Sequence, residues 1–395
     1  MTVARTGSDQ VIDENAEPLI VYGPLSDRYD FGPQHPLTPR RFGPGIDLLR
    51  ATGASRFLPP EPASEEHLLR LHDARYIETV KVFARDQDRP TSAGIGPGDC
   101  PPFVDMHDVS AAVAGGSIAA MDRILSGQES HVFQPGGGLH HAMADRASGF
   151  CIYNDVALAV ARARDAGHRV MYVDLDVHHG DGVQALFWDD PQVLTVSLHE
   201  TGDALFPGTG FESETGGRGA PGTAVNVPLE PFSGDASWLP AFEMVVPALA
   251  EAFAPTVLVS QHGCDSHAYD PLAHLRLTTL AYARATRALD RIAHERCDGR
   301  WFATGGGGYD AYRVVPRSWS LVWLAQAHRD VPDETPAPWR ERWADEAAGF
   351  EQTPPPGTFI DPPDIVQPDP ETMITVNQRT ADRALALSLR LQGRT

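Results

Sequence analysis

The sequence predicts a single-domain α/β protein built on a central, mostly parallel β-sheet flanked by helices. Short apolar segments typical of buried strands alternate with longer alanine-rich helical segments through the middle of the chain. The residues with unusual polar chemistry follow directly after several of those strands. Because sites in an open parallel sheet form outside the carboxyl ends of the strands, we expect one site at that edge.

The expected elements follow one another in regular order. Strands are predicted at residues 19–22, 131–134, 170–174, 193–198, 224–227, 256–260 and 301–304. Helices are predicted near residues 109–125, 155–166, 238–253 and 278–296. Asp155 and Thr278 are expected to be the N-caps of two of these helices.

The two ends of the chain differ in character from this middle part. Residues 1–18 are expected to form a flexible N-terminal segment, and residues 19–330 the domain that carries the polar motifs. Residues 331–395 are rich in proline and acidic residues, which predicts an extended segment that wraps the surface. A short amphipathic helix is expected near residues 380–391.

Composition and charge exclude several classes of protein. The chain has 395 residues, 42% of them hydrophobic, and a formal net charge of −21. Such acidity argues against stable nucleic-acid binding, which needs a cationic surface, and is compatible with cationic substrates. No apolar run reaches the roughly 18–20 residues that span a membrane. The N-terminus lacks a secretory signal pattern, and the four cysteines are scattered, so we expect a cytoplasmic protein.

Residues 174–182, with the sequence DLDVHHGDG, are the most informative stretch. Alternation along an extended chain places Asp174, Asp176 and His178 on the same side. Asp176 and His178, with the distant Asp265, would give a three-ligand site with an open position, as a catalytic zinc requires. A lone Asp-x-His is better explained by capping and turn hydrogen bonds. Here, five ionisable residues in eight positions follow a buried strand, and their desolvation would be costly without a metal.

Two adjacent histidines, His140 and His141, follow a glycine run that lets the backbone bend sharply. By themselves they could be two solvent-exposed loop residues. Asp174 and Asp181, however, could each hold one imidazole through Nδ1, which fixes the tautomer and raises its basicity. That arrangement suits a general base acting on water.

Tyr309 follows a second glycine run at residues 305–308. The run lacks the Lys-Ser/Thr of a P-loop, so a nucleotide site is not supported. The phenol of Tyr309 could donate a hydrogen bond to a developing oxyanion. The alternative interpretation is that Tyr309 is a buried core residue without a role in catalysis.

Taken together, these segments resemble the histone deacetylase branch of the arginase/deacetylase superfamily and its bacterial acetoin-utilisation-type members. The motifs occur in family order over about three hundred residues, and any one alone would be weak. They include DFGPQHP, GGGLHH, GFCIYND, DLDVHHGDG, FPGTG, QHGCDSH and GGGGY. The resemblance implies an arginase/deacetylase fold with a sheet of about eight strands, in which residues 19–330 form the deacetylase catalytic domain.

The resemblance also implies roles for individual residues. The metal, Zn²⁺ with Fe²⁺ as the alternative, would bind to Asp176, His178 and Asp265. The catalytic residues would be His141, His140, Tyr309, Asp174 and Asp181. Asp99, Gly149, Phe150 and Phe206 would bind the substrate. A structural K⁺ would bind to Asp174, Asp176, His178, Ser197 and the Leu198 carbonyl.

The implied activity is a zinc-dependent amidohydrolase reaction, in which metal-activated water converts acetyl-lysine of a protein or peptide into acetate and free amine. A small-molecule amidohydrolase that acts on acetylpolyamines or another acylated amine stays open, as does a catalytically silent binding protein. Arginase-like chemistry with two Mn²⁺ ions is less well supported, because only Asp265 follows strand 256–260 closely. The oligomeric state is not indicated.

Overall fold

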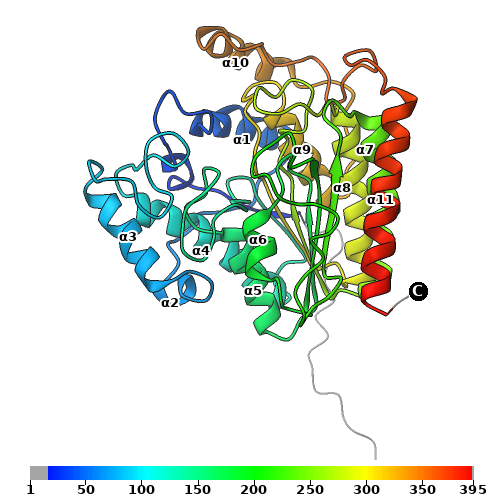
Figure 1. Cartoon of the computed structure of the whole chain (residues 1–395). Coiled ribbons are helices and arrows are strands. Elements are labelled where there is room, and N and C mark those ends of the chain that lie inside the picture. Colours follow the sequence, from blue (N-terminus) through cyan, green and yellow to red (C-terminus); the bar gives the residue numbers. More distant parts are fainter. Residues whose placement is uncertain (1–16, 394–395) are drawn as a thin grey trace, which may run out of the picture.

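The structure, a computed structural model, describes residues 17–393 and is organised around one eight-stranded β-sheet (Figure 1). The strand order is β2-β1-β3-β8-β7-β4-β5-β6, and each neighbouring pair is parallel. The predicted fold class is thus confirmed. The strands are β1 (Leu19–Val21), β2 (Phe57–Leu58), β3 (His131–Gln134), β4 (Val170–Asp174), β5 (Val193–Glu200), β6 (Ala224–Leu229), β7 (Val257–Gln261) and β8 (Trp301–Thr304).

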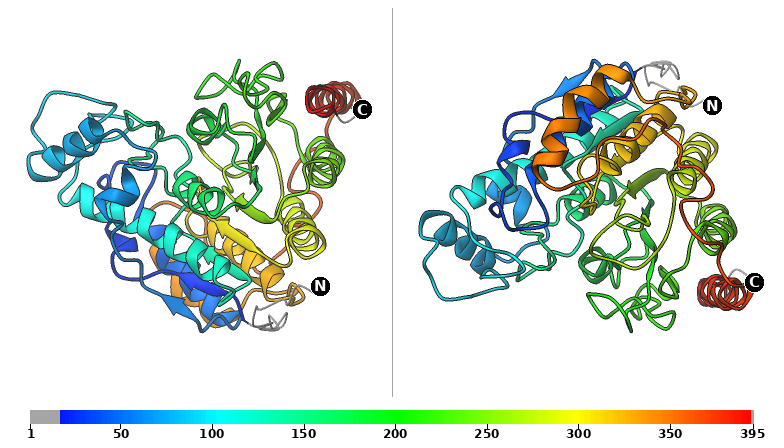
Figure 2. Two further views of the ribbon diagram at one scale, coloured as in Figure 1. Left: turned by 90° about the horizontal axis from the view of Figure 1, so that it is seen from below. Right: turned by 90° about the horizontal axis from the view of Figure 1, so that it is seen from above.

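The helices form layers on both faces of the sheet (Figure 2). Alternate residues of each strand face opposite layers, so that Val132 packs with α4 and α5 while its neighbour Phe133 packs with α1 and α9. The helices are α1 (Phe42–Ala51), α2 (Glu65–Leu68), α3 (Ala74–Arg85), α4 (Met106–Leu125), α5 (Asp155–Asp165), α6 (Asp181–Leu186), α7 (Asp235–Phe253), α8 (Thr279–Arg296), α9 (Val315–Gln326), α10 (Ala337–Gly349) and α11 (Glu371–Leu391).

Sequence patterns located most of the sheet but missed one strand. Strand β2 has only two residues, both half-buried, so it shows neither an apolar run nor an alternation. Strands β5 and β6 extend two residues beyond their predicted ends (198 to Glu200, and 227 to Leu229). Their additional residues are part of the same parallel ladder.

One of the two predicted N-caps is right and the other is wrong. The Thr278 side chain caps α8 by accepting a backbone hydrogen bond from its first turn. Helix α5 is capped by Asn154 and not by Asp155. The Asp155 carboxylate points elsewhere and accepts hydrogen bonds from the backbone N–H groups of Gly138 and Leu139. It therefore braces the loop that leads into the adjacent histidines.

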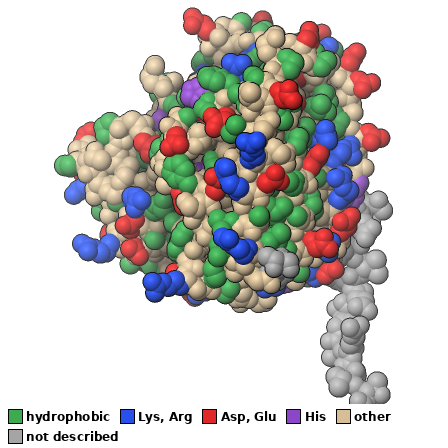
Figure 3. All heavy atoms as spheres, turned by 45° about the vertical axis from the view of Figure 1, so that its right-hand side comes forward, with side chains coloured by type: hydrophobic (Ala, Val, Ile, Leu, Met, Phe, Trp, Pro, Cys, Tyr) green, Lys and Arg blue, Asp and Glu red, His purple; other side chains and the backbone are tan. Residues whose placement is uncertain are grey.

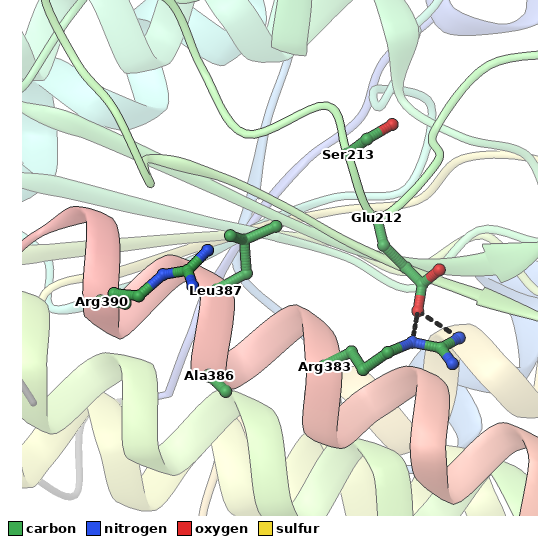
Figure 4. A pocket seen from close by; sticks show the side chains of 6 residues that line it. All are labelled: Glu212, Ser213, Arg383, Ala386, Leu387 and Arg390. Carbon is green, nitrogen blue, oxygen red and sulfur yellow. Dashed lines mark hydrogen bonds and ion pairs between the residues drawn. The ribbon is translucent and has the colours of Figure 1, made fainter.

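The C-terminal residues are more helical than predicted. Instead of an extended segment with one short helix, they form α10 and the long α11, which begins at Glu371. Helix α11 lies along the outer side of α7 (Figures 1 and 2). Between α11 and the loop after β5, a groove is closed at one end by the Arg383–Glu212 ion pair (Figure 4). The other residues around the groove are Ser213, Ala386, Leu387 and Arg390.

The flexible segment predicted for residues 1–18 falls almost entirely outside the described residues, and the division of the chain at residue 330 stays a prediction. No helix within residues 17–393 is long and apolar enough to cross a membrane. On the face drawn in Figure 3, acidic and basic side chains are interspersed, so the net negative charge does not gather there in one patch.

A buried aspartate fastens the segment between α10 and α11 to the body of the protein. Asp361 pairs with the fully buried Arg317 at 2.8 Å and with His267 Nε2 at 2.8 Å, and it also accepts the N–H of Thr279. Burial opposes the charge of Asp361, but the hydrogen bond from His267 and the charge of Arg317 outweigh it and lower the pKa of Asp361. The ionised carboxylate is therefore the form that holds this segment in place.

We expect Asp361→Ala to destabilise the protein by about 3–5 kcal/mol, because it leaves the buried Arg317 without its partner. Urea unfolding measures this difference, and the exposed Asp364→Ala is the control. Since the folded pKa of Asp361 is lowered, its contribution is fully present above the unfolded pKa of about 3.9 and is lost as the pH falls through the folded pKa. Equal unfolding midpoints for the two variants at pH 7 would contradict this expectation.

Candidate active site

Four neighbouring strands at the centre of the sheet carry the site. The adjacent strands β3, β8, β7 and β4 all end at the same edge, and the polar motifs follow them directly. Three of the polar motifs line one narrow pocket, and the fourth reaches it through Asp265, which lies 3.1 Å from His178. The residues that line the pocket are Leu37, Gly138, Leu139, His140, His141, Gly149, Phe150, Cys151, Asp176, His178, Gly306, Gly307 and Tyr309.

Asp176 and His178, which line this pocket, form a compact cluster with Asp265. All three are buried, and one potential ligand atom from each lies within 4.8 Å of the others. His178 Nδ1 lies 3.1 Å from Asp176 Oδ1 and 3.1 Å from Asp265 Oδ2. The backbone N–H of Val177 donates to the other oxygen of Asp265 and so fixes that carboxylate.

The charges of this cluster favour a bound cation. Burial and the nearby Asp176 raise the pKa of Asp265 to about 6, because two carboxylates at this distance repel each other. Burial also opposes the charge of His178, but the two carboxylates outweigh it and raise its pKa to about 10. Two carboxylate oxygens and one imidazole nitrogen are a donor set that suits Zn²⁺ or Fe²⁺. The residues present therefore fit the expected metal.

Glycines allow the surrounding backbone to approach the two carboxylates. The N–H of Gly307 donates to Asp176 Oδ2 at 2.8 Å. A Cβ atom at Gly307 would lie 2.0 Å from Asp265 Oδ2, and one at Gly263 would lie 2.0 Å from Asp176 Oδ2. Any side chain at either position would therefore displace a carboxylate of the cluster.

His140 and His141 are each held by an aspartate, as predicted. His140 Nδ1 donates to Asp174 Oδ2 at 2.8 Å, and His141 Nδ1 donates to Asp181 Oδ1 at 2.7 Å. The two Nε2 atoms lie 2.9 Å apart, so they share one proton between them. Both imidazoles are almost completely buried.

The two imidazoles titrate differently. Burial lowers the pKa of His140, but the carboxylates of Asp174 and Asp176 outweigh it and raise that pKa to about 9. Burial and the neighbouring His140 together lower the pKa of His141 to about 4, in spite of Asp181. Positive charge therefore resides on His140, and His141 is the neutral partner.

Tyr309 lies beside the cluster, with its ring centroid 6.0 Å from that of Phe150. Burial and the carboxylates of Asp265 and Asp176 raise its pKa well above the usual value, so the phenol keeps its proton and can donate. The Tyr309 N–H donates to Asp270 Oδ2 at 2.9 Å, which fixes the glycine-rich loop.

Of the four residues expected to bind substrate, Gly149 and Phe150 line the pocket, and Asp99 and Phe206 contact residues that line it. Gly149 and Phe150 both have a positive φ, which turns the chain tightly against the ring of His141. Asp99 is exposed and accepts the N–H of Gly149 at 2.9 Å. Phe206 is about half exposed, and its ring centroid lies 5.0 Å from that of His141.

The residues expected to hold K⁺ lie near one another, and two of them, Asp176 and His178, also line the pocket. Asp174 of β4 pairs with Ser197 of β5, and Leu198 follows in the same strand. Asp174 Oδ1 also accepts the N–H of Asp176 at 3.2 Å. The K⁺ site itself stays a prediction.

Sequence reasoning missed several residues that hold the site together. Gln261 Nε2 donates to Asp176 Oδ2 at 2.8 Å, and the Tyr172 hydroxyl donates to Asp174 Oδ2 at 2.6 Å. Tyr172 is two residues before Asp174 and so shares its side of the strand, a signal that could have been used. Arg41 is buried behind the pocket and donates to the Gly306 carbonyl at 2.7 Å, and no sequence pattern indicated it.

Comparison with known proteins agrees with this geometry. A family model described as the histone deacetylase domain matches residues 35–326. The chain belongs to the histone deacetylase family. The acetoin utilization protein AcuC of Bacillus subtilis (strain 168) is 39% identical over 386 residues, which cover 95% of this chain and 99% of that protein.

Other members of the family are also similar. AcuC of Staphylococcus aureus (strain MSSA476) is 37% identical over 331 residues, which cover 82% of this chain and 85% of that protein. The crystal structure of an HDAC homologue complexed with SAHA superposes with a TM-score of 0.80 at 29% identity, over 93% of this chain and 100% of that one. The protein is a hydrolytic deacetylase of the AcuC-like group, so the predicted family, fold and enzyme class are confirmed.

We expect Gly307→Ala to lower the affinity for zinc by about 10–100-fold, the range for disturbing the groups that orient metal ligands. Its methyl group would collide with the Asp265 carboxylate. Competition with a chromogenic chelator measures the affinity. Gly357→Ala is the matched control, because no atom lies within 4 Å of its added methyl group. Unchanged zinc affinity in Gly307→Ala would show that these carboxylates do not bind the metal.

Proposed function

We propose that this deacetylase hydrolyses the amide of acetyl-lysine in proteins or peptides to acetate and the free amine, with Zn²⁺ as its cofactor. The observation that carries the proposal is the narrow pocket that runs past Gly149 and Phe150 to the paired histidines and the Asp176–His178–Asp265 cluster. An acylated lysine side chain is thin, apolar and uncharged, so it suits such a passage.

In this proposal Asp176, His178 and Asp265 hold Zn²⁺, with Fe²⁺ as the alternative. A zinc ion supplies Lewis-acid chemistry: it lowers the pKa of water and polarises an amide carbonyl. Asp174, Ser197 and the Leu198 carbonyl, together with Asp176 and His178, hold the structural K⁺. The buried negative charge of the three aspartates supports two cations at these positions.

The histidine pair transfers the protons of the reaction. Because only one proton lies between the two Nε2 atoms, the histidine pair can accept one further proton. His141, the less basic partner, takes a proton from the attacking water and later gives it to the leaving amine nitrogen. His140 keeps its positive charge, held by Asp174, and so stabilises the developing negative charge nearby.

Tyr309 and the entrance residues complete the proposed roles. The Tyr309 phenol donates a hydrogen bond to the oxyanion that forms on the acyl carbon. Phe150 and Phe206 contact the alkyl chain, and the exposed Asp99 carboxylate accepts backbone N–H groups of a bound peptide.

A small-molecule activity on acetylpolyamines is the second candidate, and the net charge of −21 favours it because polyamines are cationic. Turnover of an acetyl-lysine peptide and of N-acetylputrescine, with zinc-loaded and chelator-stripped enzyme, separates the candidates. We expect metal-dependent cleavage with a higher kcat/KM for the peptide. A preference for N-acetylputrescine would overturn the proposed substrate, and cleavage of neither would overturn both.

Tyr309→Phe is expected to lower kcat by about 10²–10³, the range for losing one oxyanion donor, while zinc content stays unchanged. Tyr312→Phe is the matched control, because its hydroxyl donates to Glu346 away from the pocket. Steady-state kinetics with the acetyl-lysine peptide provides the measurement. Near-full turnover of Tyr309→Phe would remove the phenol from the mechanism.

We expect Asp99→Asn to lower kcat/KM for an acetyl-lysine peptide by about tenfold or more, since hydrogen bonds to a charged group contribute about 1.5–3 kcal/mol. Asparagine keeps an oxygen for the Gly149 N–H, so the entrance loop should stay in place. An N-acetylated alkylamine without backbone amides is the control substrate, and its kcat/KM should not change. An equal loss for both substrates would contradict peptide-backbone binding by Asp99.

A further inference from the structure

A second cluster of metal-binding side chains lies at the opposite edge of the sheet from the active site. It consists of His131, Asp290, His294 and His328. His131 is the first residue of β3, whose other end leads to the active-site histidines. Asp290 and His294 are one turn apart on α8, and His328 comes two residues after the end of α9.

The four side chains point their ligand atoms at one another. His328 Nε2 lies 3.1 Å from His294 Nε2 and 3.3 Å from Asp290 Oδ1. Asp290 Oδ1 lies 3.6 Å from His294 Nε2 and 3.9 Å from His131 Nε2. A tetrahedral zinc with ligand bonds of about 2.0–2.1 Å separates its ligand atoms by about 3.3–3.4 Å. The observed distances lie around that value.

Two of these atoms, His131 Nε2 and Asp290 Oδ1, are buried and make no well-aligned hydrogen bond within residues 17–393, although His328 Nε2 lies 3.3 Å from Asp290 Oδ1. His131 is 3% exposed, and its Nδ1 lies 2.9 Å from the carbonyl oxygen of Gln326. Because a carbonyl only accepts, Nδ1 carries the proton and Nε2 turns a free lone pair into the cluster. A backbone carbonyl that holds the second ring nitrogen is the usual support of a metal-bound histidine.

The backbone at His328 brings the fourth potential ligand to the cluster. His328 has a φ of +53°, an unfavourable backbone conformation that brings its ring to the other three side chains.

We propose that His131, Asp290, His294 and His328 bind a structural zinc ion that is separate from the catalytic centre. Four protein ligands leave no open position for substrate, so this site stabilises the fold and takes no part in hydrolysis. The ion links β3, α8 and the turn after α9. His294 and His328 are partly exposed, which gives the ion a route from solvent.

The test counts zinc ions in chelator-stripped, reloaded and desalted protein by mass spectrometry. The wild type should hold about two zinc ions per chain, His294→Ala about one, Asp265→Ala about one and the double variant none. His294→Ala should keep its deacetylase activity. His67→Ala, an exposed histidine on α2, is the matched control and should hold as much zinc as the wild type. Cobalt-loaded Asp265→Ala should show the visible absorption of a tetrahedral site.

The same series also shows how the proposal could fail. One zinc ion in the wild type that disappears in Asp265→Ala would overturn the second site and leave the catalytic metal intact. Two zinc ions retained in His294→Ala would also overturn it. If His294→Ala does not fold, His328→Ala with its more peripheral side chain replaces it. In the Asp265→Ala background, zinc should raise Tm, and an additional His328→Ala change should remove that rise.

Discussion

Three aspartates, Asp174, Asp176 and Asp265, are buried within one small region at the carboxyl edge of the sheet. Buried carboxylates are costly unless cations or hydrogen-bond donors face them. Much of the surrounding structure supplies such partners. His140 pairs with Asp174, His178 lies between the other two, and the backbone N–H of Gly307 in the glycine-rich loop donates to Asp176.

The parallel sheet makes this concentration of charge sterically feasible. Strands β3, β8, β7 and β4 end side by side, so the four loops that follow them bring their side chains together from rigid supports. Rigid supports matter because the two histidines divide their proton according to small differences in position and charge. His140 faces two carboxylates, whereas His141 faces one and has His140 beside it. The opposite pKa shifts of two adjacent, chemically identical side chains follow from that asymmetry.

Much of this fold and site could be predicted from the sequence, because its signals are local. An apolar strand followed by DLDVHHGDG, or a glycine run followed by HH, predicts both the secondary-structure element and the edge of the sheet at which the polar side chains lie. The missed features depend on distant contacts. The two-residue strand β2 forms because it pairs with β1. Asp155 does not cap α5, because its carboxylate accepts hydrogen bonds from a loop that precedes it in the sequence. The C-terminal residues were predicted to be extended because they are rich in proline, but α11 forms because it packs against α7 and β6.

The two clusters of potential metal ligands show the same difference between features with a local sequence signal and features that depend on distant contacts. Asp176 and His178 are two residues apart just after β4, so their spacing alone predicted a ligand pair. At the other edge, Asp290 and His294 have ordinary helical spacing, and His131 and His328 become their neighbours only when β3 and α9 pack against α8. The chemistry differs accordingly. In the two proposals, three ligands around an open position would serve a reaction, whereas four that enclose an ion would fasten structural elements together. The proposed closed site lies at the edge where the strands begin, away from the pocket at their carboxyl ends, so it uses none of the residues of that pocket.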